Sequence, residues 1–309
     1  MHQLIETIPE TEELVINWHI TEACNFRCRY CFASWEKAVG GKELWRSEDS
    51  FHRLLEALHG LFSLCSSDDP LRGGLRWRSL RLSLAGGEPT LLDGRLVDVV
   101  AYARTLGFNV SLITNGSRPD VIDGVARYID MLGLSVDSLG ELTNEAIGRA
   151  CSKGSRVSAD GAVAIVRRAR SHRPGVSIKI NTVVSAANAG EDLSELILRT
   201  HPDRWKVMRM LPTVTDALSV NADAFRSFVD RHRAFQSLMT VEDNTDMAKS
   251  YIMIDPYGRF FQNEPGLHGY RYSRPIPEVG AGAAFREVAF SPAGFASRYR
   301  KDQITSGTP

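Results

Sequence analysis

A regular alternation of strand and helix patterns dominates the chain between residues 15 and 215. Short runs rich in β-branched and apolar residues predict strands, and each is followed by a segment whose apolar residues recur at helical spacing. The six predicted strands lie in VINWHIT, LRLSLAGGEP, NVSLITNGS, MLGLSVDS, GVSIKINTVVS and RWKVMRML. Because helical connections place successive strands parallel in one sheet, the pattern predicts an α/β fold built as a partial (β/α)6 barrel.

The alternation stops after residue 215, which suggests three parts. We expect an N-terminal extension (1–14), the barrel core (15–215) and a C-terminal extension (216–309). NADAFRSFVDRHRAFQSLM predicts one more amphipathic helix, whereas the stretch from SYIMIDPYGRFF onward is rich in Gly and Pro and is expected to cap one end of the barrel. Chemistry in such barrels gathers where strands end, so the segments that follow strands are the first candidates for a site.

Composition and charge exclude several classes of protein. The 309 residues carry 37 Lys and Arg against 37 Asp and Glu, which argues against a non-specific nucleic-acid binder. The first residues lack the basic and apolar regions of a signal peptide, and no apolar run approaches the roughly 20 residues of a membrane span. The sequence therefore predicts a soluble, cytoplasmic protein that binds neither nucleic acid nor membrane, and the pattern of five cysteines fits a reducing compartment.

Three of these cysteines, Cys24, Cys28 and Cys31, cluster in the loop after the first predicted strand. Structural zinc takes four ligands, and only His19 on the preceding strand could be the fourth. A catalytic thiol or a disulfide pair does not explain three clustered cysteines. An iron–sulfur cluster fits better, because three thiolates leave one iron of a cubane open to a small molecule. Cys65 and Cys151 match no motif, and we expect packing roles for them.

The spacing Cys-x3-Cys-x2-Cys after a first strand, with LAGGEP after the second, resembles the radical S-adenosylmethionine (SAM) superfamily. The finer resemblance is to the viperin family of antiviral nucleotide dehydratases, and it extends from residue 15 to the mid-280s. It is carried by NWHITEACNFRCRYCF, TNGS, LSVDS, IGR, IKIN, RWKV and SYIMIDPYGRF. The resemblance implies a barrel of the radical SAM type with a C-terminal segment capping the active site. It also implies SAM and a [4Fe–4S] cluster held by the three clustered cysteines as cofactors.

The activity that the resemblance implies is that of a radical SAM lyase acting on a ribonucleoside triphosphate: CTP, UTP or GTP. In that reaction a deoxyadenosyl radical removes the 4′ hydrogen and the 3′ hydroxyl is lost. The product is a 3′-deoxy-3′,4′-didehydro nucleotide that terminates viral RNA chains. Further implied partners are a reductase or flavodoxin-type electron donor and the iron–sulfur assembly machinery. Two alternatives stay open: a radical SAM enzyme acting on another small phosphorylated substrate, and a module that holds a metal only for structure.

For SAM itself, the resemblance assigns five residues. Gly87 and Glu88 match the motif at the amino group, Ser135 and Arg149 match the positions at the carboxylate, and Asn115 lies near the ribose. Glycine fits this place because the backbone must approach its ligand closely.

Three cations on two adjacent predicted strands suggest a phosphate site. Lys179, Arg204 and Lys206 alternate with apolar residues, so they share a strand face. Inward-facing cations are costly unless an anion pairs with them, although any one of them could instead lie on an exposed face. The resemblance adds Asn181 beside the ribose or phosphates. It also marks Arg81, which stands where the family usually has Lys and keeps the charge without a transferable proton.

Four further residues complete the predicted site. Asn17 and His19 share one face of the first strand and are expected near the substrate, with satisfied polar residues inside a barrel as the alternative. Asp255 and Tyr257 in the C-terminal segment are expected to close over the nucleotide and keep water from the radical, with Tyr257 among the catalytic residues. An ordinary buried tyrosine is the alternative for Tyr257. Ala85 stands where the animal proteins have Ser.

Overall fold

The computed structural model describes residues 8–33, 42–64, 66, 70–71, 73–150, 157–263 and 269–303. The strands are β1 (Glu10–His19), β2 (Arg76–Ala85), β3 (Asn109–Thr114), β4 (Met131–Ser135), β5 (Ser177–Val184), β6 (Arg204–Arg209), β7 (Met239–Glu242), β8 (Ile252–Ile254), β9 (Phe260–Gln262) and β10 (Arg271–Tyr272). The helices are α1 (Glu48–Phe62), α2 (Gly94–Thr105), α3 (Pro119–Ala126), α4 (Glu141–Ile147), α5 (Ala159–His172), α6 (Ser194–Thr200), α7 (Ala222–Arg231), α8 (Ile276–Val279), α9 (Ala281–Phe285) and α10 (Pro292–Gln303). Cys65 and Cys151 lie outside the described residues.

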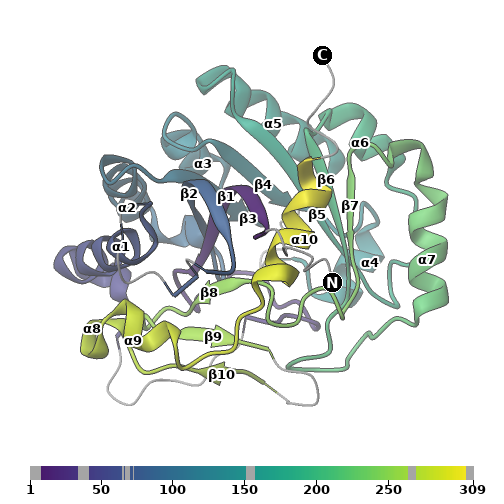
Figure 1. Cartoon of the computed structure of the whole chain (residues 1–309). Coiled ribbons are helices and arrows are strands. Elements are labelled where there is room, and N and C mark those ends of the chain that lie inside the picture. The colour runs from purple at the N-terminus through teal and green to yellow at the C-terminus, as the bar shows by residue number, and fades with distance from the viewer. Residues whose placement is uncertain are drawn as a thin grey trace, which may run out of the picture.

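All ten strands belong to one curved sheet in the order β10-β9-β8-β1-β2-β3-β4-β5-β6-β7 (Figure 1). Strands β1 to β7 run parallel to their neighbours, and β1 to β6 are the six strands predicted from the sequence. The helices α1 to α3 and α5 to α7 surround this sheet on its outer side. The predicted α/β partial barrel is confirmed.

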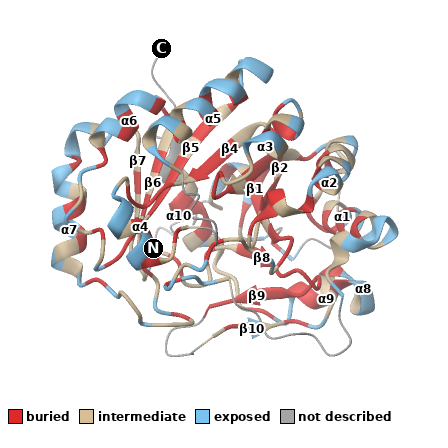
Figure 2. Cartoon of the chain, turned by 180° about the vertical axis from the view of Figure 1, so that it is seen from behind, coloured by how far each residue is buried: buried red, intermediate tan, exposed pale blue. Residues whose placement is uncertain are grey.

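The outer helices form because each buries one apolar face, and α1, α5 and α7 also begin with a side-chain cap. In α1, the Ser47 side chain accepts a hydrogen bond from the Ser50 N–H, and Leu54, Leu55 and Leu58 are buried against the sheet. Each such leucine contributes about 1.5–3 kcal/mol through burial. Figure 2 shows exposed residues on the outer helix faces and buried residues along the strands. The apolar faces of the helices therefore cover the outer side of the sheet.

The part after residue 215 differs from the expectation in two ways. Helix α7 ends at Arg231, and Met239–Glu242 forms β7, a seventh parallel strand that pairs with β6. Four residues are too few to show a strand periodicity, so the sequence pattern favoured a longer helix. The segment expected as a cap instead begins by extending the sheet: β8 pairs with β1 in parallel, and β9 pairs with β8 antiparallel.

Helix α10 fastens the end of the chain to the barrel. Its Phe295 and Ala296 are completely buried in the main core, and the helix packs against β1. This contact matters for the site because α10 also carries a buried arginine, described below. None of the helices among the described residues is both long and apolar enough to cross a lipid bilayer.

Candidate active site

A cavity of about 300 Å³ opens inside the barrel at the side where the cysteine loop leaves β1. It is lined by most of the residues that the sequence singled out: Asn17, His19, Cys24, Cys28, Cys31, Gly87, Glu88, Asn115, Ser135, Arg149, Lys179, Asn181 and Lys206. The parallel register explains this grouping, since it sets His19 beside Ala85 and Asn181 beside Lys206 on neighbouring strands. Residues scattered over almost 200 positions of the chain thereby face one space.

The cysteine loop is held against the Gly86-Gly87 turn by backbone contacts. The Gly87 N–H donates to the Thr21 carbonyl at 2.7 Å, and the Glu88 N–H donates to the Ala23 carbonyl at 2.8 Å. A Cβ on Gly87 would lie 2.1 Å from the Ala23 carbonyl oxygen, which no side chain can tolerate. The glycine is therefore required by the close approach of the cysteine loop itself.

The other side of the cysteine loop is fixed in the same manner by the end of α4. Arg27 N–H donates to the Gly148 carbonyl at 3.0 Å, and Arg29 N–H donates to the Ile147 carbonyl at 2.9 Å. Gly148 has φ +78°, and a Cβ there would lie 2.0 Å from the Arg27 carbonyl oxygen. Two glycine contacts thus clamp the loop between the ends of β2 and α4.

The donor chemistry of the loop fits an iron–sulfur cluster. Cys24, Cys28 and Cys31 are free thiols, and burial raises the pKa of all three, that of Cys28 to about 12. They are protonated until iron displaces the protons. Backbone N–H groups point at two of the sulfurs, Phe26 N–H at Cys24 Sγ and Ala33 N–H at Cys31 Sγ, each at 3.4 Å. Such donors stabilise thiolate ligands.

A single metal ion fits this loop less well than a cluster. No group of three or more His, Cys, Asp or Glu side chains that could hold one metal ion occurs within the described residues. A cubane cluster makes a different demand, because each thiolate binds its own iron.

Glu88 joins the glycine turn to the end of β3. Its carboxylate accepts four hydrogen bonds, from the Thr90 N–H (3.1 Å), the Thr90 hydroxyl (2.6 Å), the Thr114 hydroxyl (2.6 Å) and the Asn115 N–H (2.7 Å). Burial raises the pKa of Glu88, and these four donors oppose the rise. A carboxylate so fully engaged acts as a brace for the turn and for Asn115.

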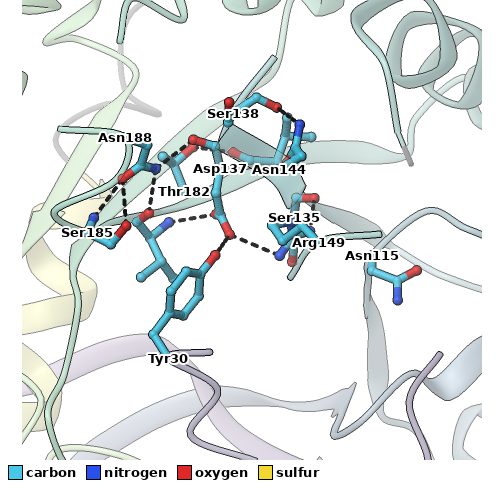
Figure 3. Close-up of polar contacts among 12 residues, drawn as sticks. Tyr30, Asn115, Ser135, Asp137, Ser138, Asn144, Arg149, Thr182, Ser185 and Asn188 are labelled. Carbon is cyan, nitrogen blue, oxygen red and sulfur yellow. Dashed lines mark hydrogen bonds and ion pairs between the residues drawn. The ribbon is translucent and has the colours of Figure 1, made fainter. Parts of the chain in front are cut away.

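Asp137 forms the second buried anchor, just beyond β4 (Figure 3). One oxygen accepts from Arg149 Nη1 at 2.9 Å and from the Tyr30 hydroxyl, and the other accepts from the Val183 N–H at 2.8 Å. Arg149 Nη2 also donates to the Ser135 carbonyl at 2.6 Å. Burial disfavours the charged form of Arg149, yet the charge of Asp137 prevails and raises the pKa of Arg149. Asp137 thereby ties the cysteine loop, through Tyr30, to the barrel.

The two lysines of the cavity lie farther from the strand ends than is usual for residues of a site in such a barrel. Lys179 is the third residue of β5 and Lys206 the third of β6, so both stand in the first half of their strands and not at the carboxyl ends. Lys206 Nζ lies 2.8 Å from Glu242 Oε1 and 2.9 Å from the Tyr251 hydroxyl. Arg209, at the end of β6, also lines the cavity and pairs with Asp243 at 3.2 Å.

Four predicted site residues do not line this cavity: Arg81, Arg204, Asp255 and Tyr257. Arg81 forms a bidentate ion pair with Glu13, at 2.5 and 2.7 Å, and donates to the Ser111 hydroxyl at 3.0 Å. Arg204 is the first residue of β6, at the far end of the strand from the cysteine loop.

The remaining two belong to the β8–β9 turn. Asp255 is fully buried and accepts from Arg259 Nε at 2.7 Å and from the Tyr257 N–H at 3.0 Å. Burial, with a hydrogen bond to Glu22, raises the pKa of Tyr257 to about 12. The carboxylate of Asp255 therefore shapes the turn, and neither Asp255 nor Tyr257 lines the cavity.

The first strand supplies two neutral polar groups to the cavity. The ring of His19 packs edge-on against Phe32 and Phe261, with centroids 5.5 and 5.2 Å apart, and burial lowers its pKa to about 3. Asn17 Nδ2 donates to the Ile252 carbonyl at 3.2 Å. Both residues line the cavity, and their placement near the substrate stays a prediction.

Sequence reasoning missed several lining residues. The sequence places Asp137 just after a strand, where chemistry gathers in such barrels, but it assigns Asp137 no role in the site. Ser83 lies two residues after Arg81 on β2, so the two side chains share one face of the strand. This spacing was a usable signal for Ser83. Tyr251 and Asn263 also line the cavity, but they come from the segment whose strands were not predicted.

Comparison with known proteins agrees with this geometry. Residues 18–197, more than half of the chain, match the family model of the radical SAM superfamily. SuiB of Streptococcus suis, solved with S-adenosylmethionine bound, shares the fold with a TM-score of 0.54 and 15% identity, over 81% of this chain and 60% of that one. The chain therefore belongs to the radical SAM superfamily.

Relatives with higher identity narrow the assignment. The "S-adenosylmethionine-dependent nucleotide dehydratase" of Pseudoalteromonas ulvae is 39% identical over 291 residues, covering 94% of each chain. The protein of the same name from Psychrobacter lutiphocae is 41% identical, over 95% of this chain and 97% of its own. The RSAD2 protein of Oncorhynchus mykiss is 30% identical, over 92% and 78%. Within the superfamily, the chain belongs to the viperin family of these dehydratases.

Radical SAM enzymes use a [4Fe–4S] cluster and SAM, and these are the cofactors of this chain. The residues present fit both groups. The cavity contains three thiols for iron, and it also contains the buried Arg149 as a cation for a carboxylate.

Proposed function

We propose that the protein is a radical SAM lyase that dehydrates a ribonucleoside triphosphate, with CTP, UTP or GTP as substrate. The reaction would remove the 4′ hydrogen and the 3′ hydroxyl of the ribose and yield a 3′-deoxy-3′,4′-didehydro nucleotide. Because this product cannot be extended in RNA, the activity would serve antiviral defence. One observation carries the proposal: three thiols and the inward-facing Lys179 and Lys206 line a single cavity. The relatives are named nucleotide dehydratases, which supports a nucleotide as the substrate class.

The cofactor residues are assigned on the geometry of the thiol side. Cys24, Cys28 and Cys31 would hold the cluster. When bound, the cluster and SAM supply a 5′-deoxyadenosyl radical that takes hydrogen from the substrate. The backbone of the Gly87–Glu88 turn would meet the SAM amino group.

The remaining SAM contacts are assigned to three residues of the cavity. Arg149, with Ser135, would hold the SAM carboxylate, and Asn115 would lie near its ribose. Asp137 keeps the Arg149 guanidinium charged and oriented for this task.

The substrate residues are assigned on charge and depth. Lys179 and Lys206, from adjacent strands, would bind phosphate oxygens, and Asn181 would donate beside them. Asn17 and His19 would lie near the ribose, where a neutral imidazole can hydrogen-bond without adding charge. Loss of the 3′ hydroxyl as water consumes one electron and one proton. We therefore also propose a reductase or flavodoxin-type donor, and iron–sulfur assembly proteins, as partners.

The test is anaerobic turnover with single nucleotides. The reconstituted, reduced protein is incubated with SAM and with CTP, UTP, GTP or ATP separately, and 5′-deoxyadenosine is followed. We expect one nucleotide to stimulate SAM cleavage and to become lighter by one water in the mass spectrum. Cleavage without any change in a nucleotide would reject the dehydratase and favour another small phosphorylated substrate. Cys28→Ala, which removes a cluster ligand, is the control for cluster-dependent cleavage.

A pair of variants on β6 tests the phosphate assignment. Lys206 lines the cavity and Arg204 does not, although both side chains belong to the same strand face. We expect Lys206→Met to raise the KM for the nucleotide about ten-fold or more, because a charge-assisted contact is lost. Arg204→Met should raise it far less. A larger effect of Arg204→Met would place the phosphates lower in the barrel than proposed.

A further inference from the structure

Helix α10 carries one buried arginine that lies beside the cavity. Arg298, on α10, is 5% exposed. Its Nε lies 3.0 Å from Glu242 Oε1, its Nη1 donates to the Ser250 carbonyl at 2.6 Å, and its guanidinium lies 3.4 Å from the centre of the Tyr251 ring. This arginine belongs to a part of the sequence that carried no motif, and it does not itself line the cavity.

Glu242, at the end of β7, connects this arginine to the phosphate site. Its Oε1 is shared between Arg298 and Lys206, the latter at 2.8 Å, and its Oε2 accepts from the Tyr251 hydroxyl. Burial alone would raise the pKa of Glu242, but the charges of Lys206 and Arg298 prevail and hold it well below its ordinary value. The carboxylate is therefore ionised, between two cations.

The net charge of Lys206, Glu242 and Arg298 determines whether this part of the cavity attracts or repels the phosphates of a nucleotide. Lys206 and Glu242 alone would sum to zero, and an ionised carboxylate 2.8 Å from the ammonium would repel incoming phosphate. Arg298 adds a second positive charge at the same carboxylate oxygen, from a side chain that does not line the cavity. The three groups then sum to +1, and this charge is presented at Lys206, the member that lines the cavity.

We propose that Arg298 is a positioning residue for the nucleotide, acting through Glu242 to fix the Lys206 ammonium and to leave its charge available to the substrate phosphates. This inference rests on the proposed function, since it assumes that Lys206 binds phosphate. It links the C-terminal helix to the substrate site through Glu242, although Arg298 does not line the cavity.

The test compares variants with the wild type in the presence of whichever of CTP, UTP and GTP the wild type binds best. Arg298→Met should raise the Kd and the KM about ten-fold or more, since the carboxylate then cancels Lys206. It should change kcat and nucleotide-independent SAM cleavage little. Arg298→Lys keeps the charge and should stay within about three-fold of wild type. Arg226→Met on the exposed face of α7 is the control for loss of a surface arginine.

A double variant separates charge balance from packing of the helix. Arg298→Met combined with Glu242→Gln again leaves one net positive charge, on Lys206. We expect it to recover most of the nucleotide affinity that Arg298→Met loses, whereas a defect in helix packing would not be repaired. If Arg298→Met binds the nucleotide as the wild type does, or if the double variant recovers nothing, the inference is wrong.

Failure of the underlying function has a different signature. If Lys206→Met leaves the nucleotide Kd unchanged, the phosphate assignment fails, and the inference about Arg298 fails with it. If Lys206→Met weakens binding and Arg298→Met does not, only the inference about Arg298 fails.

Discussion

Two sides of the same cavity stabilise their charged groups differently. On the thiol side, Glu88 accepts four hydrogen bonds and Asp137 accepts three, all from the chain itself. On the cation side, made of Lys179, Asn181 and Lys206, the Glu242 carboxylate is shared by Lys206 and Arg298, and these three charges sum to +1. The charged groups of the thiol side are satisfied by the protein alone, whereas the proposed function assigns the charge of the cation side to the phosphates of a substrate.

This contrast indicates which changes each side tolerates. Backbone contacts that exclude even a Cβ hold the cysteine loop, so its geometry is sensitive to volume. The cation side depends on the sum of charges, so a substitution that keeps the charge should be tolerated there. The following predictions test this distinction and are ordered by the size of the expected effect.

Gly87→Ala should have the largest effect. The added Cβ would lie 2.1 Å from the Ala23 carbonyl oxygen and 2.6 Å from its carbon, both backbone atoms of the cysteine loop. The loop must then move, and we expect most of the reconstituted iron and sulfide per chain to be lost. Gly94→Ala is the matched control, because a Cβ there meets nothing within 4 Å. Full iron content in Gly87→Ala would mean that the clamp does not position the cluster ligands.

Asp137→Asn tests the buried ion pair. The isosteric amide leaves the Arg149 charge buried without its carboxylate, and breaking such a pair costs about 3–5 kcal/mol. We expect a matching fall in the free energy of unfolding in urea, together with weaker binding of SAM. Asp93→Asn, which breaks the exposed ion pair with Arg118, should change stability little. Equal losses in the two variants would contradict the importance of burial.

Much of the fold and of the thiol side was predictable from the sequence. The strand–helix alternation identified β1 to β6, and the cysteine spacing with LAGGEP identified the loop and its turn. These features are local: periodicity, glycine and ligand spacing act within a few residues. The contacts of Arg81 and Arg298 were not predictable, because they depend on which distant carboxylate packs beside each cation.

Arg81→Met follows from one of these unpredicted contacts. The Arg81 guanidinium is paired with Glu13 and does not line the cavity, so we expect it to support the barrel and not the nucleotide. We expect a fall of about 1–3 kcal/mol in the free energy of unfolding, from the lost charged hydrogen bonds, with an unchanged KM for the nucleotide. A raised KM at unchanged stability would restore Arg81 to the substrate site.

Tyr30→Phe should give the smallest effect on the thiol side. The hydroxyl donates to Asp137, and burial, with the charge of Asp137, raises the pKa of Tyr30 far above neutrality, so it remains a donor. Its loss still leaves Asp137 the bonds from Arg149 and Val183. We expect a loss of about 1–2 kcal/mol in the free energy of unfolding, and an unchanged iron content because the glycine clamps remain.

Tyr102→Phe provides the matched control for this last variant. The Tyr102 hydroxyl also donates to a carboxylate, that of Glu56, but this pair lies at the exposed surface, where water replaces the lost partner. Stability should therefore fall more in Tyr30→Phe than in Tyr102→Phe. If the two variants lose the same stability, burial adds nothing to the Asp137 anchor. The thiol side would then owe its rigidity to the glycine contacts alone.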